Sequence, residues 1–131
     1  MSGPRLAQLD IVYELDAATT TLGVFYAVMT LPGSYLITAA RFIPNLTSTA
    51  GATNTTTLTL TNGATTIGAW DTTTGQDGTL TAGTDVAFPL DGTGSQLVLA
   101  QNDVLKLTKS IAAAGVKAHG RLSLLLEHRP L

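Results

Sequence analysis

The stretch TNTTTLTLTNG (residues 53–63) decides the fold, because a run this rich in threonine is either a disordered tract or a β-strand. Leucine recurs at every second position, at Leu58 and Leu60, and threonine fills the positions between them. This period-two alternation of apolar and β-branched residues is typical of a half-buried strand. Disordered tracts are instead rich in Pro, Glu, Ser or Lys. The stretch therefore predicts a strand with one polar face, covered by threonine.

The residues that follow predict a hairpin. Asn62-Gly63 precedes ATTIGAW, and Asn-Gly is a strong hairpin signal because a type I′ turn needs φ > 0 at both central positions. With these two residues as the loop, Leu58 lies opposite Ile67. One face is then expected to hold Leu58, Leu60, Thr65 and Ile67. The other face is expected to hold Thr57, Thr59, Thr61 and Thr66.

Short apolar or alternating segments, separated by turn signals, make up most of the remaining chain. Strands are predicted over 9–16, 22–30, 34–44, 86–90, 96–100, 104–110 and 121–128, with a long loop over 71–85. In 34–44, one face is expected to carry Tyr35, Ile37, Ala39 and Arg41, and the other Leu36, Thr38, Ala40 and Phe42. Strands spaced this closely predict an all-β protein, a single antiparallel β-sandwich or jelly roll. The length of 131 residues suits one domain, with a core over 34–131 and an N-terminal arm or extra strand pair over 1–33.

The composition excludes several classes of function. Charged residues make up 12% of the chain, against a usual share of about 25%. The seven Lys and Arg are scattered and the net charge is −2, so a nucleic-acid partner is not expected. No apolar stretch approaches the ~18 residues of a membrane span, and the start lacks the pattern of a signal peptide. The chain is expected to fold in a cytoplasm, and without cysteine it has neither disulfides nor thiolate zinc sites.

The titratable residues do not form a recognisable catalytic set. Most carboxylates adjoin Gly, Asn or Thr, where Asp commonly hydrogen-bonds to nearby backbone N–H groups in turns. His119 and His128 are expected at the surface, since no nucleophile motif accompanies them. We therefore expect a protein that is not an enzyme, with no catalytic residue, no metal site and no cofactor.

Two groups of apolar residues are candidates for contact with a partner. Residues 22–30, LGVFYAVMT, are apolar on both alternating sets, so a neighbour is expected to cover this strand. Trp70 could form a sugar-stacking platform with the tyrosines and the 71–85 loop. Because aromatic residues total only 5%, filling the core or a subunit interface is the favoured role for Trp70. The candidate interface residues are Leu22, Val24, Phe25, Tyr26, Val28 and Trp70.

From residue 34 onward the order of segments resembles a known family. GSYLITAARFIPN is followed by the threonine-rich hairpin, a short VAF strand, SQLVLAQNDVLKLTKS and RLSLLLEH. This order is similar to that of the small jelly-roll head decoration proteins, or capsid cement proteins, of tailed bacteriophages. Three segments carry the resemblance: the opening G-x-Y strand, the turn at Asp103 between Leu99 and Leu107, and the closing strand from Leu122 to Glu127. It covers about three quarters of the chain, and residues 1–33 fall outside it.

The resemblance implies a structural protein of the virion, made in the host cytoplasm and seated on the capsid exterior. Its partners would be copies of itself, as a trimer, and the major capsid protein. The alternative is a carbohydrate- or receptor-binding β-sandwich module of a head fibre or tail tip. The two hypotheses differ in oligomeric state and in whether Trp70 and the 71–85 loop contact a sugar.

Overall fold

The computed structural model describes residues 6–12, 21–27, 34–91, 97–100, 103–113 and 120–129, with side chains for those of these residues between 34 and 127. The described residues form nine strands and no helix. The strands are β1 (Leu6–Val12), β2 (Thr21–Ala27), β3 (Ser34–Pro44), β4 (Thr55–Asn62), β5 (Thr65–Asp71), β6 (Val86–Ala87), β7 (Val98–Leu99), β8 (Asp103–Ala112) and β9 (Gly120–Arg129). Each predicted strand overlaps an observed one, and residues 13–16 and 28–30 of the predicted strands lie outside the described residues.

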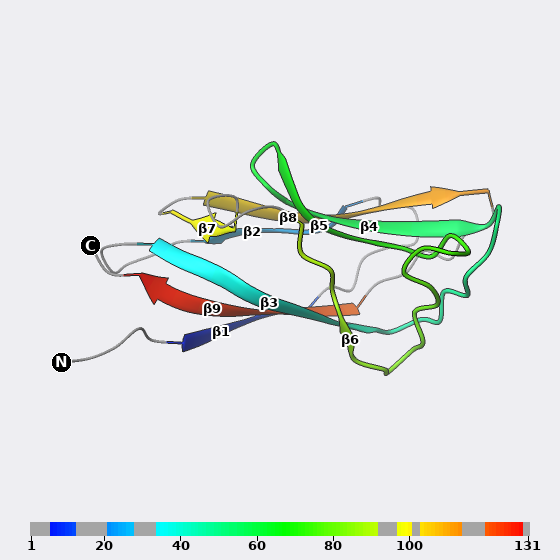
Figure 1. Cartoon of the computed structure of the whole chain (residues 1–131), viewed down its shortest axis with the longest axis horizontal. Coiled ribbons are helices and arrows are strands. Elements are labelled where there is room, and N and C mark those ends of the chain that lie inside the picture. The colour runs from blue at the N-terminus through cyan, green and yellow to red at the C-terminus, as the bar shows by residue number, and fades with distance from the viewer. Residues whose placement is uncertain are drawn as a thin grey trace.

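The strands form two antiparallel sheets that face each other (Figure 1). One sheet has the order β1-β9-β3-β6, with β7 also paired to β3, and the other has the order β2-β8-β4-β5. Because β6 and β7 pair with opposite ends of β3, they count as one interrupted strand. Each sheet then has four strands, and the chain changes sheet at most of its connections. This is the eight-stranded, two-sheet arrangement of a jelly roll, so the predicted all-β sandwich is confirmed.

The core lies between the two sheets. Alternate residues of the long strands point inward, such as Leu122 and Leu124 of β9 and Leu105 and Leu107 of β8, all 0% exposed. The rings of Phe42 and Phe88 pack edge to face in this core, with centroids 6.4 Å apart. The alternation also places one charged residue, Lys109, on the inner side, where it is 2% exposed.

One flank of the sandwich, here called the closed flank, is sealed by residues 86–91. This segment bonds to both sheets: the Phe88 N–H donates to Ala40 O of β3 at 2.9 Å, and the Asp91 N–H donates to Ile67 O of β5 at 2.7 Å. Gly68 permits this close approach, because a Cβ at its position would lie 2.5 Å from Pro89 O. The free edges of β3 and β5 are therefore both covered on this side.

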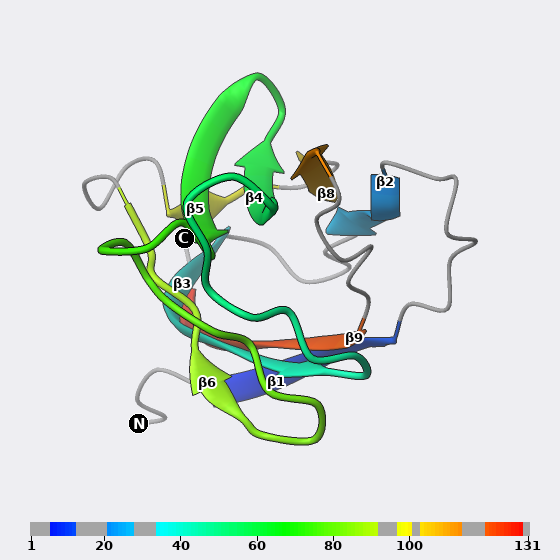
Figure 2. The same ribbon diagram turned by 90° about the vertical axis from the view of Figure 1, so that its right-hand side faces the viewer.

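The opposite side, here called the open flank, is bounded by β1 and β2. The strand order places β1 at the far end of one sheet and β2 at the far end of the other. Viewed along the sandwich, β2 lies at the right and β5 and β6 at the left (Figure 2). The two N-terminal strands do not pair with each other, since β1 pairs with β9 and β2 with β8. The division of the chain at residue 33 stays a prediction.

The β4–β5 hairpin turns one residue later than predicted. Its loop consists of Gly63 and Ala64, and Asn62 pairs with Thr65. Gly63 has a φ of 60°, whereas Ala64 is not among the residues with positive φ. A type II′ loop needs a positive φ at its first central position, which glycine meets best. Asn62 instead belongs to the strand, and its Nδ2 donates to Asp103 Oδ2 at 3.2 Å.

A bulge moves the hairpin register further from the prediction. The register shifts between Leu60 and Thr61, so Leu58 lies opposite Trp70 and not opposite Ile67. Thr65 is exposed and does not share the apolar face. The polar face of β4 is present, since its outward threonines remain half-buried while Leu58 and Leu60 are 0% exposed.

A second bulge changes the faces of β3. Ile37 pairs with Leu126 and Ala39 with Leu125, which leaves Thr38 as an extra residue. Ile37 and Ala40 are consequently both buried, although strict alternation would place them on opposite faces. The predicted faces over 34–44 are therefore wrong where they cross Thr38: the prediction places Ile37 and Ala40 on opposite faces, but both point inward. Thr38 is exposed, and its Oγ1 donates to Leu125 O at 3.1 Å.

Candidate interaction surfaces

Trp70, the aromatic residue considered for sugar stacking, lies in the core. Its side chain is 9% exposed and belongs to the same cluster of buried residues as Leu58 and Leu80. The indole Nε1 donates to Gly78 O at 3.0 Å, which ties the 71–85 loop to β5. The prediction that Trp70 fills the core is confirmed, and its role in a subunit interface stays a prediction.

Two loops at one end of the sandwich are fastened together by hydrogen bonds. Ser48 and Leu80 exchange two backbone bonds of 2.7 and 2.9 Å, and the Gly51 N–H donates to Thr72 O at 3.1 Å. Beneath these contacts, Thr72 Oγ1 accepts the Thr56 N–H at 2.8 Å, and Ser48 Oγ donates to Thr56 Oγ1 at 3.2 Å. Ser48, Thr56 and Thr72 are 2% exposed or less. The 45–54 and 71–85 loops thus form one fixed surface, here called the loop end.

Three aspartates accept hydrogen bonds from backbone N–H groups close to them in the chain. Asp71 Oδ1 accepts from the Thr73 N–H at 2.8 Å and from its hydroxyl at 2.6 Å, and Asp77 Oδ2 accepts the Asp71 N–H at 2.8 Å. Asp103 Oδ2 accepts the Ala100 N–H at 2.9 Å. The predicted turn role is confirmed for these three residues. His119 lies outside the described residues, and the side chain of His128 is not described.

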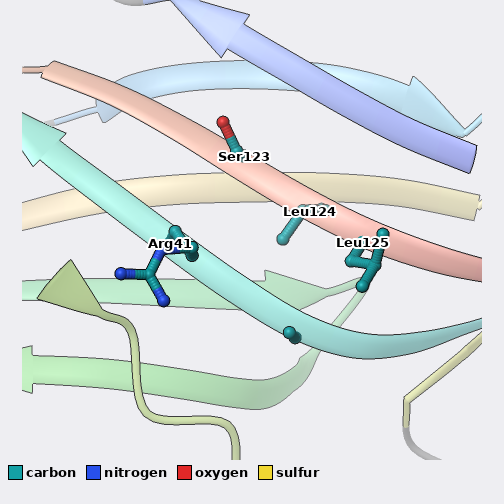
Figure 3. Close-up of a pocket in the computed structure, with 5 residues that line it drawn as sticks. Arg41, Ser123, Leu124 and Leu125 are labelled. Carbon is teal, nitrogen blue, oxygen red and sulfur yellow. The ribbon is translucent and has the colours of Figure 1, made fainter. Parts of the chain in front are cut away.

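A small hollow lies on the outer face of the β1-β9-β3-β6 sheet, beside the Thr38 bulge. It has a volume of about 200 Å³ and is lined by Ala39, Arg41, Ser123, Leu124 and Leu125. Figure 3 shows Arg41 on β3 and Leu125 on the neighbouring strand β9. Leu125 is 38% exposed, and the Arg41 guanidinium Nε lies 2.7 Å from Asp85 Oδ2. The hollow lies over the paired positions Ala39–Leu125 and Arg41–Ser123, and the strand pattern of the sequence does not mark it.

The apolar interface candidates lie mainly in an edge strand. Leu22, Val24, Phe25 and Tyr26 belong to β2, the outermost strand of its sheet on the open flank. Val28 lies outside the described residues. The structure brings the β2 candidates to one edge and leaves Trp70 in the core, on β5. Their role in an interface stays a prediction.

No group of three or more His, Cys, Asp or Glu side chains that could hold a metal ion occurs in the described part of the chain. The same residues contain no helix that is long and apolar enough to cross a membrane.

Comparisons with known proteins give a weak structural likeness. No protein-family model and no curated protein matches the chain. Two solved structures, of infectious bursal disease virus strains Gt and Gx, are similar over 98% and 99% of this chain, which spans 38% of theirs. The sequence identities are 19% and 17%, and the TM-scores are 0.35 and 0.36. A likeness this low carries no argument about function.

Proposed function

We propose that the chain is a non-enzymatic structural protein of a virion, which decorates and stabilises a bacteriophage capsid from its exterior. Copies of the chain would associate as a trimer and contact the major capsid protein. The observation that carries the proposal is the jelly-roll strand order, since it accommodates every segment on which the sequence resemblance to phage head proteins rests. Fold alone does not define function, so the surface has to agree with it.

The surface supports a role in assembly. It contains few charges; Asp71 and Asp103 accept hydrogen bonds in turns, and Asp85 forms an exposed ion pair. Threonine covers the outer side of β4, with Thr57 and Thr59 half-buried. This face presents mainly hydroxyl groups to a neighbouring molecule, with Lys106 opposite Thr61 and Asp71 opposite Thr57 at its ends.

Two measurements test the proposal. Light scattering of the purified protein should give three times the chain mass of 13.5 kDa, which is 40.5 kDa. The protein should also sediment with undecorated shells of its phage, and should raise the temperature at which those shells come apart. A protein that neither sediments with the shells nor changes their stability would contradict the proposal.

The alternative, a carbohydrate- or receptor-binding module, needs a different test from substitution of Trp70. Because Trp70 is buried, Trp70→Ala would lower stability by about 3–5 kcal/mol whatever the function. Thr74 and Gln76 are exposed on the loop end and can be replaced without touching the core. Glycan binding that is lost in Thr74→Ala or Gln76→Ala would favour the alternative.

A further inference from the structure

The open flank leaves two long strand edges without a described partner. Within the described residues, β1 pairs only with β9 and β2 only with β8. Each strand is seven residues long and therefore presents a row of backbone N–H and C=O groups along its outer side. An uncovered strand edge is a template for pairing with another chain.

The other edges of the fold are protected, which makes this pair distinctive. On the closed flank, β6 and β7 contain two residues each, and residues 90 and 91 cover β5 at Gly68 and Ile67. Short strands and covering segments are the usual ways in which proteins protect a sheet edge, together with charges and proline. β2, with the sequence TLGVFYA, has no charged residue and no proline. β1, with the sequence LAQLDIV, has one charge, Asp10.

We propose that β2 of one copy pairs with β1 of the next copy, in a ring of three around a threefold axis parallel to the strands. The proposal rests on the trimer of the proposed function and assigns its interface. Strand direction allows it: β8 and β9 run in opposite directions, and β2 and β1 are antiparallel to them (Figure 1). β1 and β2 therefore run in opposite directions. Rotation about such an axis preserves direction, so the two strands meet as an antiparallel pair.

The position of the two edges allows the ring to close. β1 and β2 lie on the same flank but in different sheets, and stacked sheets are about 10 Å apart. A copy with its open flank toward the axis thus presents β2 to one neighbour and β1 to the other. Head-to-tail contacts of this kind form a closed ring when the rotation between neighbouring copies is 120°. In the closed trimer each β1 edge and each β2 edge is paired.

Twofold contacts are the competing arrangements. A twofold axis parallel to the strands would pair β1 with β2, as the threefold axis does, but would give dimers. About a twofold axis perpendicular to the sheets, β2 would pair with β2 and β1 with β1, and the charges disfavour this arrangement. Asp10 of both copies would then lie on the same ladder, and like charges close together across strands are destabilising. In the threefold ring, Asp10 lies beside β2, which has no charge.

Disulfide cross-linking tests the contact directly, because the chain has no cysteine of its own. Gln8 and Asp10 of β1 lie opposite Leu125 and Ser123 of β9. Val24 and Tyr26 of β2 lie opposite Lys106 and Val104 of β8. None of these four partner residues on β8 and β9 is buried. Four double variants combine Gln8→Cys or Asp10→Cys with Val24→Cys or Tyr26→Cys, which samples the register. At least one should oxidise to a covalent trimer on a non-reducing gel, and to no larger species. A bond within one chain is not expected, because disulfides need Cα atoms about 4.4–6.8 Å apart.

The single variants and a control pair define the opposite outcomes. Each single variant should remain a monomer on the gel, and Thr74→Cys with Ser110→Cys, both exposed and on other elements, measures chance cross-linking. Covalent dimers of Val24→Cys alone, or covalent dimers in place of trimers from a double variant, would show a twofold contact and overturn the proposal. A particle of trimer mass without cross-links above the control would also overturn it, while leaving the trimer of the proposed function in place. A monomer at every concentration would overturn both.

Discussion

Threonine has two different roles in this chain, which depend on whether its hydroxyl is buried. Thr57 and Thr59 lie half-buried on the outer side of β4, where water can reach them. Thr56 and Thr72 are 0% exposed, and Thr72 Oγ1 accepts the Thr56 N–H at 2.8 Å. A buried donor that loses its acceptor keeps the cost of its desolvation. The buried hydroxyls of Thr56 and Thr72 therefore hold the loop end in place. The hydroxyls of Thr57 and Thr59 on β4 are accessible to a partner.

Thr72→Val tests this role, because it keeps the shape of the side chain and removes the acceptor of the Thr56 N–H. We expect the free energy of unfolding to fall by about 1–3 kcal/mol, measured by urea denaturation. Thr74→Val, the same change at an exposed position of the same loop, is the control and should change stability by less than about 0.5 kcal/mol. Equal effects of the two substitutions would contradict the assigned role.

The bulge at Thr38 determines which side chains of β3 face the core. Deleting Thr38 would leave Ile37 and Ala39 as neighbours opposite Leu126 and Leu125, which are also consecutive. The ladder would then be regular, with Ile37 and Ala40 still facing inward. We expect the Thr38 deletion to fold, with a cooperative thermal transition and strand content by circular dichroism close to those of the unaltered chain.

Deletion of Arg41 is the matched control, because Arg41 is also an exposed residue of β3. It shifts one part of the strand by one position and exchanges inward and outward side chains there. This variant should unfold at a much lower temperature or aggregate. If the Thr38 deletion proved as damaging as the Arg41 deletion, the bulge would be needed for more than the alternation of faces.

The strand segments could be predicted from the sequence because their signal is local. In β4, Leu58 and Leu60 alternate with threonine, and this pattern gave the correct element and the correct polar face. The bulges in β3 and β5 could not be predicted, because Thr38 and Ile67 look like any other strand residue. Likewise, the apolar pattern of β2 predicted a covered strand, but its place at the edge depends on β8, which lies far along the chain.

The N-terminal strands β1 and β2 are expected to contribute to the stability and solubility of the whole protein, because they cover the outer edges of β9 and β8. Removing residues 1–33 would turn β8 and β9, ten residues each, into uncovered edges. We expect the shortened chain to show a lower melting temperature by circular dichroism and to aggregate, because long apolar edges promote association. Removing only residues 1–5, which precede β1, should change neither property. A soluble and equally stable 34–131 chain would instead establish it as an independent core.

The position of β9 has a consequence for the order in which the protein can fold as it is synthesised. β9 lies between β1 and β3, and both of these strands leave the ribosome long before it. Until residues 120–129 emerge, β1 and β3 have no common partner, and the core lacks Leu122, Leu124 and Leu126. Pairings between distant segments form late, and the apolar surface left exposed in the meantime favours aggregation. Nascent chains would therefore depend on chaperones, or on rapid insertion of β9 between β1 and β3, to avoid aggregation.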